Sequence, residues 1–249
     1  MRRNKKLNVQ SNSRREYSGK QELVDAEAGL ESYNLDIVSQ FYRNLNLDSK
    51  DQKLKLMDFG AGTGALAEIW QREYGINPIC LEIDNGLCKI LNEKSFVTFQ
   101  NLDLMSSDFT AVYTSNVLEH IEDDRKSLRD IRAIMQVGGK LAIYVPALPF
   151  LFSDMDAQVG HYRRYKRKEL IEKVQESGFT VEKCYWNDCI GVAAWFSLKI
   201  LGYKGKVGIG SKKSLIVYDK FVYPISKILD KLFFKKIIGK NLFLFAKAK

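Results

Sequence analysis

The most constraining stretch of this sequence runs from Leu54 to Ala65 and consists of LKLMDFGAGTGA. Its first half is short and mostly apolar, which is typical of a buried strand in a parallel sheet. Gly60, Gly62 and Gly64 follow directly, and the residues from Ala65 onward have the apolar spacing of a helix. A strand, a glycine-rich turn and a helix in this order bring backbone N–H groups close to a ligand. Glycine suits the turn because a Cβ would block that approach and positive φ values recur there.

The glycines have the spacing G-x-G-x-G, and Asp58 lies two residues before the first of them. This combination resembles the first motif of class I S-adenosylmethionine-dependent methyltransferases. The resemblance implies that S-adenosylmethionine is the cofactor and that it is bound by Asp58, Gly60, Ala61, Gly62, Thr63 and Gly64. Taken alone, the glycines also fit an ordinary tight turn or a dinucleotide site.

A second candidate cofactor residue, Glu82, ends the strand that we predict over 77–84. It lies about twenty residues beyond the glycines, the separation expected within one βαβ unit. A carboxylate at this position can accept hydrogen bonds from both ribose hydroxyls. The alternative is that Glu82 caps the helix predicted over 86–93. The family register further implies that Ile83 makes an apolar contact with adenine.

Two more segments place candidate residues after predicted strands. Asp103 follows the strand predicted over 96–99, and the resemblance implies that Asp103 and the adjacent Leu104 bind adenine; a turn-capping Asp is the alternative. Asn116 follows the strand predicted over 110–115 and begins the sequence NVLEH, which resembles a further motif of the family. The carboxyl ends of parallel strands form the ligand-binding edge of such a sheet, so we expect Asn116 at the cofactor.

Strand and helix patterns alternate along the chain, which predicts an α/β fold. The resemblance implies a doubly wound, Rossmann-like sheet of seven strands, parallel except for the last, with an N-terminal helical cap and a helical insertion before the last strand. The predicted organisation is a basic arm over 1–20 and a domain over 21–249, with cap helices over 21–50, a substrate loop over 146–166 and the insertion over 189–238.

The substrate loop carries the pattern S-x-x-D-x-x-x-G-H-x-R-R-Y, which resembles a methyltransferase subgroup associated with glycan and lipid-linked sugar pathways. His161 is the first candidate for a general base, since the ordinary pKa of histidine is nearest neutrality. Asp156 is the second candidate, or it orients His161. Arg163, Arg164 and Tyr165 are predicted to bind substrate, the arginines through a phosphate or carboxylate. Stabilisation of the loop by the same side chains is the alternative.

Charge and residue spacing limit the remaining classes. The formal net charge of +9 permits an anionic partner, whether nucleic acid, phospholipid or a phosphorylated substrate. No cluster of His and carboxylates has the spacing of metal ligands, so no metal is predicted. We see no RNA-binding module, and nucleic acid is therefore not the expected partner. We predict O-directed methyl transfer onto a saccharide, lipid-linked or other small-molecule acceptor. An RNA methyltransferase and a cofactor-binding scaffold without turnover stay as alternatives to this function.

The insertion has an apolar stripe at helical spacing between 218 and 233, interleaved with lysines. Such a helix can lie on an anionic membrane surface, cover the active site, form a dimer face or pack on its own core. The N-terminal residues lack an apolar stretch behind their basic charges, so we expect no signal peptide. We expect a cytoplasmic protein, with a peripheral position at the inner membrane face as a further option, and the oligomeric state is left open.

Overall fold

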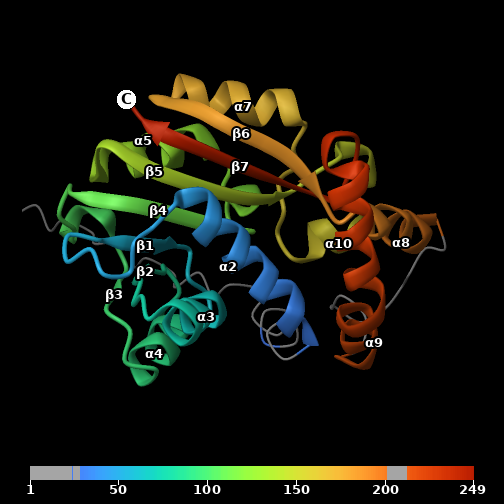
Figure 1. The fold of residues 1–249 in the computed structure, drawn as a ribbon, viewed down its shortest axis with the longest axis horizontal. Coiled ribbons are helices and arrows are strands. Elements are labelled where there is room, and N and C mark those ends of the chain that lie inside the picture. Colours follow the sequence, from blue (N-terminus) through green and yellow to red (C-terminus); the bar gives the residue numbers. More distant parts are fainter. Residues whose placement is uncertain (1–23, 25–28, 201–211) are drawn as a thin grey trace, which may run out of the picture.

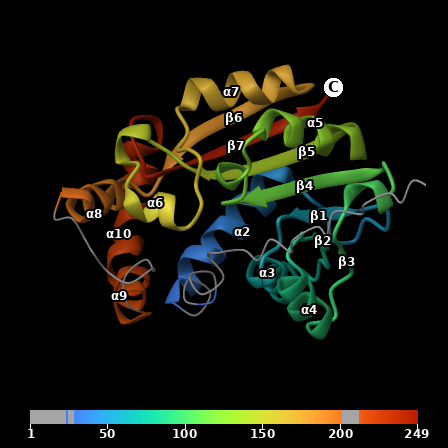
Figure 2. The same ribbon diagram turned by 180° about the vertical axis from the view of Figure 1, so that it is seen from behind.

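The computed structural model describes residues 24, 29–200 and 212–249, apart from the side chains of Leu104 and Leu198. The predicted arm over 1–20 and most of the Gly/Lys-rich loop over 202–213 lie outside the described residues. The described elements form one twisted sheet with helices on both of its faces (Figures 1 and 2). This is the layered α/β arrangement that the alternating sequence pattern predicts.

The sheet has seven strands in the order β3-β2-β1-β4-β5-β7-β6. The first five strands in the chain run parallel to one another, and β7 runs antiparallel to both of its neighbours, β5 and β6. The predicted fold class is therefore confirmed, including the reversed last strand. The strands are β1 (Leu56–Phe59), β2 (Ile79–Leu81), β3 (Thr98–Phe99), β4 (Phe109–Ser115), β5 (Met135–Pro146), β6 (Phe179–Asn187) and β7 (Asn241–Ala248).

The helices connect these strands and cover the sheet. They are α2 (Glu31–Leu45), α3 (Ala65–Tyr74), α4 (Asn85–Glu93), α5 (Asp124–Ile134), α6 (Asp154–Gln158), α7 (Arg167–Glu176), α8 (Cys189–Ile200), α9 (Lys212–Val217) and α10 (Tyr223–Leu232). Single helical turns are η1 (Leu102–Leu104), η2 (Leu118–His120), η3 (Pro149–Leu151) and η5 (Phe234–Lys236), and η4 (Tyr218–Val222) is a short π-helix.

Side chains of the central strands alternate between two cores, as the two-residue period of a strand requires. On β4, Val112 packs in one core while its neighbour Tyr113 packs in the other. The first core includes Leu128 of α5 and Leu170 of α7. The second includes Phe41 of α2 and aromatic residues of α3 and α10. Both faces of the sheet are thus buried, which explains why the central strands are apolar almost throughout.

The insertion is joined to the N-terminal helix by a capping contact that the sequence pattern does not reveal. Residue Leu30 offers α2 no side-chain cap. The carboxylate of Asp219, from η4, instead accepts from the backbone N–H groups of Ser32 at 2.9 Å and Tyr33 at 2.8 Å. This contact fixes the start of α2 to the insertion, near the carboxyl end of β5, where the hydroxyls of Tyr33 and Tyr144 lie 2.6 Å apart.

The beginning of β5 differs from the sequence-based prediction. The apolar spacing over 124–135 predicts a helix that includes Met135, and the sequence over 138–146 predicts a strand that begins after a glycine turn. In the structure, Met135 already has extended backbone and pairs with Phe109, and the register shifts before Lys140 pairs with Ala111. Met135 is 3% exposed, so its side chain is buried in the first core. Burial of Met135 and a bulged pairing therefore replace the predicted helix end.

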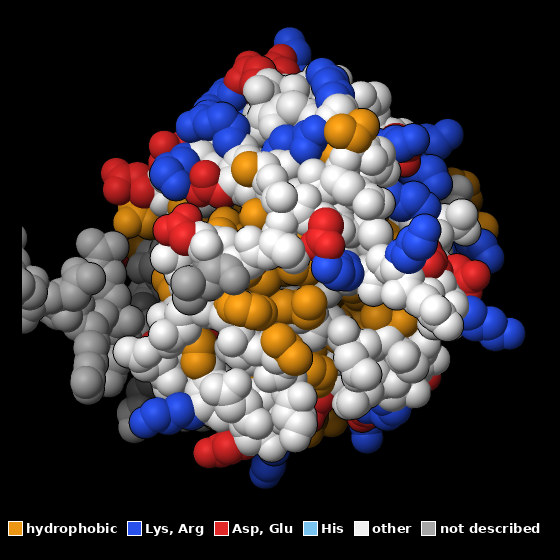
Figure 3. All heavy atoms as spheres, turned by 90° about the vertical axis from the view of Figure 1, so that its left-hand side faces the viewer, with side chains coloured by type: hydrophobic (Ala, Val, Ile, Leu, Met, Phe, Trp, Pro, Cys, Tyr) orange, Lys and Arg blue, Asp and Glu red, His pale blue; other side chains and the backbone are white. Residues whose placement is uncertain are grey.

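The two ends of the sheet differ in what surrounds them. Helices α8, α9 and α10 lie at the end toward which the parallel strands point (Figures 1 and 2). At the opposite end, apolar side chains gather near the centre of the face and Lys and Arg side chains lie mostly around them (Figure 3). In open parallel sheets ligands bind beyond the carboxyl ends of the strands, so the first of these two ends is the place to look for a site.

Candidate functional site

The glycine turn has the backbone that the sequence predicts. Gly60, Gly62 and Gly64 have φ values of +81°, +57° and +86°, in the region that favours glycine. The turn also packs closely, because a Cβ on Gly60 would lie 2.4 Å from the Cγ2 atom of Val117. The N–H group of Gly60 donates to the carbonyl of Leu81 at 2.9 Å, which ties the turn to the end of β2.

Helix α3 begins directly after this turn. Gly64 is its N-terminal capping residue and provides no side-chain acceptor for the first N–H groups. Ala61 and Thr63 are buried in the turn below the helix end. An uncapped helix N-terminus behind a glycine turn attracts a polar or anionic ligand group, because its first N–H groups lack intrahelical acceptors. These residues therefore fit a cofactor that approaches the backbone closely.

Glu82 connects the glycine turn to the loop after β2. Its carboxylate is 8% exposed and accepts from the N–H group of Gly62 at 2.9 Å and from that of Asp84 at 2.9 Å. Burial raises the pKa of Glu82, and the backbone donors oppose that rise. The alternative role for Glu82 is wrong, because Asp84 caps α4 by accepting from Leu87 and the residue before it. Each Glu82 oxygen retains a lone pair for a further donor.

Asp58 lies below the turn, near the end of β1, and is 3% exposed. The hydroxyl of Tyr113, on the neighbouring strand β4, donates to its Oδ2 atom at 2.7 Å. Burial raises the pKa of Asp58 to about 7, the Tyr113 hydrogen bond lowers it, and the charge of Glu82 raises it. The negative charges of Asp58 and Glu82 therefore repel each other across the glycine turn. Tyr113 is a contributor to this site that the sequence motif does not mark.

The remaining predicted cofactor residues lie along the same edge. Ile83 is 80% exposed directly after β2, an unusual position for a large apolar side chain. Asp103 is exposed on η1 and its backbone N–H donates to the side chain of Asn101 at 3.0 Å. Among the described residues, no hydrogen bond joins Asp103 to Glu82. Leu104 belongs to η1 too, and its side chain lies outside the described part of the structure.

Asn116 marks the end of β4 with a strained backbone. Its φ is +53°, and its side chain is exposed. Its N–H group donates to the carbonyl of Tyr144, on β5, at 2.8 Å. A left-handed residue of this kind turns the chain sharply at a strand end, and Asn tolerates that conformation better than most residues. The structure thereby places the Asn116 amide at the ligand edge between β4 and β5.

On the substrate side, the structure brings His161 and Asp156 together. The Nδ1 atom of His161 lies 2.9 Å from Oδ1 of Asp156. Arg164 donates to the same Oδ1 atom from Nε at 2.9 Å and approaches it with Nη2 at 2.8 Å. The backbone N–H of Ser153 donates to Oδ2 at 2.9 Å. Burial alone would raise the pKa of Asp156, but the hydrogen bond from His161 and the charge of Arg164 hold it below its usual range.

The other two predicted substrate residues meet a different carboxylate. Nη1 of Arg163 lies 2.9 Å from Oδ2 of Asp124, and the hydroxyl of Tyr165 donates to that oxygen at 2.8 Å. Lys173 donates to it at 2.7 Å. Tyr165 is fully buried, and Arg164 stacks on the ring of Trp195 with its Cζ 4.7 Å from the centroid. These contacts fix the loop in place, and a role in binding substrate stays a prediction for all three residues.

The turn after Asn116 supplies a cluster that sequence reasoning missed. Glu119 and His120 belong to η2, and the N–H of Tyr162 donates to the Glu119 carbonyl at 2.8 Å. The His120 and His161 rings meet edge to face with their centroids 4.5 Å apart. Burial raises the pKa of Glu119 to about 8, and burial followed by the charge of His161 lowers that of His120 to about 4. The NVLEH motif identified the segment but not this convergence.

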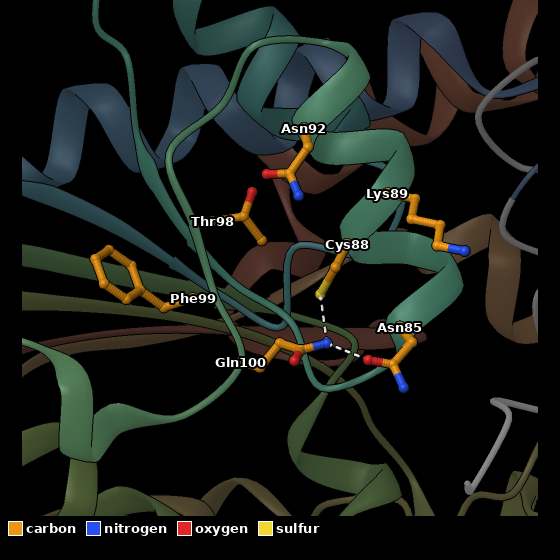
Figure 4. A pocket seen from close by; sticks show the side chains of 7 residues that line it. All are labelled: Asn85, Cys88, Lys89, Asn92, Thr98, Phe99 and Gln100. Atoms are coloured by element: carbon orange, nitrogen blue, oxygen red, sulfur yellow. Dashed lines mark hydrogen bonds between the residues drawn. The ribbon is translucent and has the colours of Figure 1, made fainter.

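A hollow of about 570 Å³ lies beside this edge, between α4 and β3 (Figure 4). Gln100 donates there to the side chain of Asn85 at 2.5 Å and to the sulfur of Cys88 at 3.5 Å. Its lining residues are not those predicted to bind cofactor. This hollow is therefore not the predicted cofactor site, which stays a prediction at the edge where Glu82 joins the glycine turn.

A comparison with known protein families matches the part of the chain that carries these residues. A family model described as "Methyltransferase domain" matches residues 31–183. That span includes the glycine turn, Glu82, Asn116 and the loop that carries His161. The match therefore covers every site residue that the sequence predicted and extends from α2 into β6.

Solved structures show the same fold. A SAM-dependent methyltransferase from Archaeoglobus fulgidus is 16% identical, with a TM-score of 0.57 over 90% of this chain and 98% of that one. Phosphoethanolamine N-methyltransferase 2 from Haemonchus contortus, with S-adenosylhomocysteine, is 16% identical, with a TM-score of 0.59 over 95% and 60%. Geranyl diphosphate C-methyltransferase from Streptomyces coelicolor is 12% identical, with a TM-score of 0.57 over 85% and 78%.

Proposed function

This chain belongs to the class I S-adenosylmethionine-dependent methyltransferases, and we propose that it methylates an oxygen of a lipid-linked acceptor, such as a saccharide on a lipid carrier. The observation that carries the proposal is an exposed apolar stripe with flanking lysines, beside the loop of His161. The enzyme class and cofactor follow from the family. The acceptor is argued from the chemistry of that surface.

The cofactor supplies an electrophilic methyl group on a positively charged sulfur. For its adenosyl part we assign the ribose hydroxyls to Glu82 and the adenine to Ile83, Asp103 and Leu104. Three observations support the assignment: the φ values of the glycine turn, the free lone pairs of the buried Glu82 carboxylate and the 80% exposure of Ile83. Asn116 lies across the same edge and is assigned to the cofactor as well.

On the acceptor side, an oxygen lone pair forms the new bond to the methyl carbon while the carbon–sulfur bond breaks and its electrons stay on sulfur. The acceptor oxygen loses its proton in the process. We assign promotion of that loss to His161 and Asp156, which are held 2.9 Å apart. Alignment of acceptor and methyl group supplies much of the rate enhancement in such displacements, and the anchored loop provides a rigid side for it.

The surface that favours a lipid-linked acceptor lies on η4 and α10. Phe221, Ile225, Ile228 and Leu232 recur every three or four residues and are each between 54% and 66% exposed. Exposed lysines flank them, which are Lys212, Lys213, Lys220, Lys227, Lys231 and Lys236. A helix with an exposed apolar face and basic flanks binds at the interface of an anionic bilayer.

Helix α8 connects this surface to the acceptor loop. Lys199 donates to the carbonyl of Phe150 at 2.5 Å, and Trp195 stacks on Arg164. Two further apolar residues of α8 are exposed in the same region, Phe196 at 45% and Ile200 at 67%. Among the described residues, no helix has both the length and the apolar character to cross a bilayer. A surface contact is therefore the mode that we propose, with the acceptor presented from the membrane.

The acceptor is tested with the purified chain, methyl-labelled cofactor and separate lipid and RNA extracts. We expect label in the lipid fraction, and none with Gly60→Ala, which obstructs the cofactor turn. Label in RNA alone would contradict the proposed acceptor while leaving the enzyme class intact. Cofactor binding without transfer to either extract would favour a scaffold.

Membrane contact is tested by flotation with vesicles of phosphatidylglycerol and phosphatidylcholine. We expect the chain to float with the vesicles and the double variant Ile225→Asp/Ile228→Asp to reduce the bound fraction at least tenfold, because it places two charges in the apolar face. Val137→Asp is the matched control, since Val137 is 79% exposed near the start of β5, at the other end of the sheet. Equal flotation of all three proteins would exclude the α10 surface.

A further inference from the structure

Glu119, His120 and His161 converge although the chain separates His161 from the other two. Each offers one ligand atom, and the three atoms all lie within 4.8 Å of one another. We propose that they form a binding site for one divalent transition-metal ion of the Zn²⁺ type. Two imidazoles and one carboxylate are a ligand set that suits this class of ion.

The carboxylate of Glu119 is the strongest indication. Glu119 is 0% exposed, and neither Oε1 nor Oε2 has a hydrogen-bond partner among the described residues. Its Oε1 atom lies 3.9 Å from Nε2 of His161, which is too long for a hydrogen bond. Two ligands of one tetrahedral zinc ion are separated by about 3.4 Å, given zinc–ligand distances of about 2.0–2.1 Å. A small side-chain adjustment would therefore let both atoms contact one ion.

The surroundings of His161 are those of a metal-binding imidazole. Its Nδ1 atom contacts Asp156, which Arg164 and Ser153 hold in place. If Nδ1–H donates to that carboxylate, Nε2 carries the lone pair that can bind a metal ion. This Nε2 atom is the one that lies near Glu119. Carboxylate–histidine–metal relays of this kind orient metal ligands and increase their basicity.

His120 is fixed in a similar way. Its imidazole is hydrogen-bonded to the backbone of Gly160 and Val159, next to His161 in the chain. Both imidazoles thus have an outer partner that orients the ring, a carboxylate for one and backbone for the other. The N–H of Tyr162 bonded to the Glu119 carbonyl holds the two segments in register. The site is consequently built from two loops that the protein itself fastens together.

Three protein ligands leave a fourth position open for water or for another oxygen. A bound divalent ion lowers the pKa of an oxygen that it contacts, so an acceptor hydroxyl in that position would lose its proton more readily. This consequence rests on the proposed function, and the binding site itself does not. With the ion bound, His161 would promote the proton loss as a ligand of the ion and Asp156 as the residue that positions His161, and the proton would pass to water.

Metal binding is tested on the tag-free chain, stripped with chelator and titrated with Zn²⁺ in the absence of cofactor and acceptor. The chain has only two histidines, both in the cluster, so nitrogen-15 labelling of histidine reports on this site alone. We expect one tightly bound ion per chain and a shift of both imidazole signals. Zn²⁺ held by the cysteines would leave both signals unshifted and would overturn the proposal.

Variants separate a ligand role from a structural one. Glu119→Gln keeps the shape of a side chain without hydrogen-bond partners, and we expect at least a hundredfold loss of affinity for Zn²⁺. Asp156→Asn should weaken binding by about 10–100-fold, the range for an outer partner of a metal ligand. Glu122→Gln, an exposed glutamate nearby, is the matched control and should bind as the parent does. Parental affinity in Glu119→Gln would refute the site, whatever the outcome of the methyl-transfer assays.

Discussion

The hydroxyl of Tyr113 donates to the carboxylate of Asp58 across 2.7 Å, linking β4 to β1 directly below the glycine turn. Asp58 is buried, and its pKa is raised from the ordinary value of 3.8 to about 7. The folded chain therefore holds a proton on Asp58 at pH values where the unfolded chain has lost it. This contribution to stability is fully present below about pH 4 and is lost as the pH rises through about 7.

Asp58→Asn should remove that pH dependence. The parent is expected to lose up to about 4 kcal/mol of unfolding free energy relative to the variant between pH 4 and pH 8, since one pKa unit corresponds to about 1.4 kcal/mol. Urea unfolding of both proteins without cofactor measures the difference. Asp48→Asn, at an exposed carboxylate, is the control. A parent and an Asp58→Asn variant with parallel pH profiles would show that Asp58 is ionised throughout.

Tyr113→Phe tests the hydrogen bond itself. The Tyr113 hydroxyl lowers the pKa of Asp58, so its removal should shift the pH at which stability is lost to a higher value. The variant leaves the ring that packs against Trp70 and Phe41 in place. A shift in the opposite direction would mean that Tyr113 accepts from a protonated Asp58 instead of donating to it.

Gly60→Ala and Gly75→Ala separate backbone strain from crowding. Both glycines have positive φ, +81° and +65°, but a Cβ at Gly75 would meet nothing within 4 Å. We expect Gly75→Ala to cost about 1–2 kcal/mol and Gly60→Ala about 3–5 kcal/mol, because its Cβ also overlaps Val117. Urea unfolding measures both. The double variant Gly60→Ala/Val117→Ala should recover part of the loss, and no recovery would attribute the whole cost to backbone strain.

Glu82→Gln should weaken binding of the cofactor product at least tenfold. The substitution replaces one carboxylate oxygen with an –NH2 group, which cannot accept hydrogen bonds. Gly62 and Asp84 both donate to the carboxylate, so the –NH2 group would also meet one of these donors. Hydrogen bonds to charged groups are worth about 1.5–3 kcal/mol each. Calorimetry with S-adenosylhomocysteine gives the affinity, and Glu93→Gln, an exposed position on α4, serves as the comparison. Equal affinities would remove Glu82 from the cofactor site.

Asp219→Ala should loosen the start of α2. The variant removes the acceptor for the Ser32 and Tyr33 N–H groups, and loss of a helix N-cap costs about 0.5–2 kcal/mol. Hydrogen exchange should accelerate at the first turn of α2 while β1 keeps its protection. Uniform acceleration across the sheet would instead indicate global destabilisation, and unchanged exchange would show that solvent caps the helix equally well.

The strand ends that carry the predicted cofactor residues could be located from sequence because their signals are local. The glycine turn, Glu82 and Asn116 each follow a strand within one or two residues, and parallel strands bring their ends to one edge. Their backbone conformations are also dictated locally, since glycine and Asn are the residues that accept positive φ. The alternating pattern predicted the doubly wound sheet, and the number of strands was implied by the family resemblance that these motifs carry.

The acceptor side could not be predicted to the same depth, because its contacts join distant segments. The sequence places Asp156 close to His161 in the chain but does not show that they touch, and their contact depends on the packing of α6. Nothing in the spacing of Glu119 and His161 signals that their side chains meet. The pairing of Asp124 with Arg163 likewise depends on how α5 lies against the loop.

The position of β7 has a consequence for how the chain matures. It is translated after the six other strands, yet it lies between β5 and β6 and supplies every ladder hydrogen bond that β6 makes in the described sheet. A nascent chain that has emerged only through β6 can assemble the five strands β1 to β5 into a sheet. Strand β6 then has no neighbouring strand to pair with. Ribosome stalling or premature termination within 241–248 would therefore leave a split sheet that invites chaperone capture or strand exchange between copies.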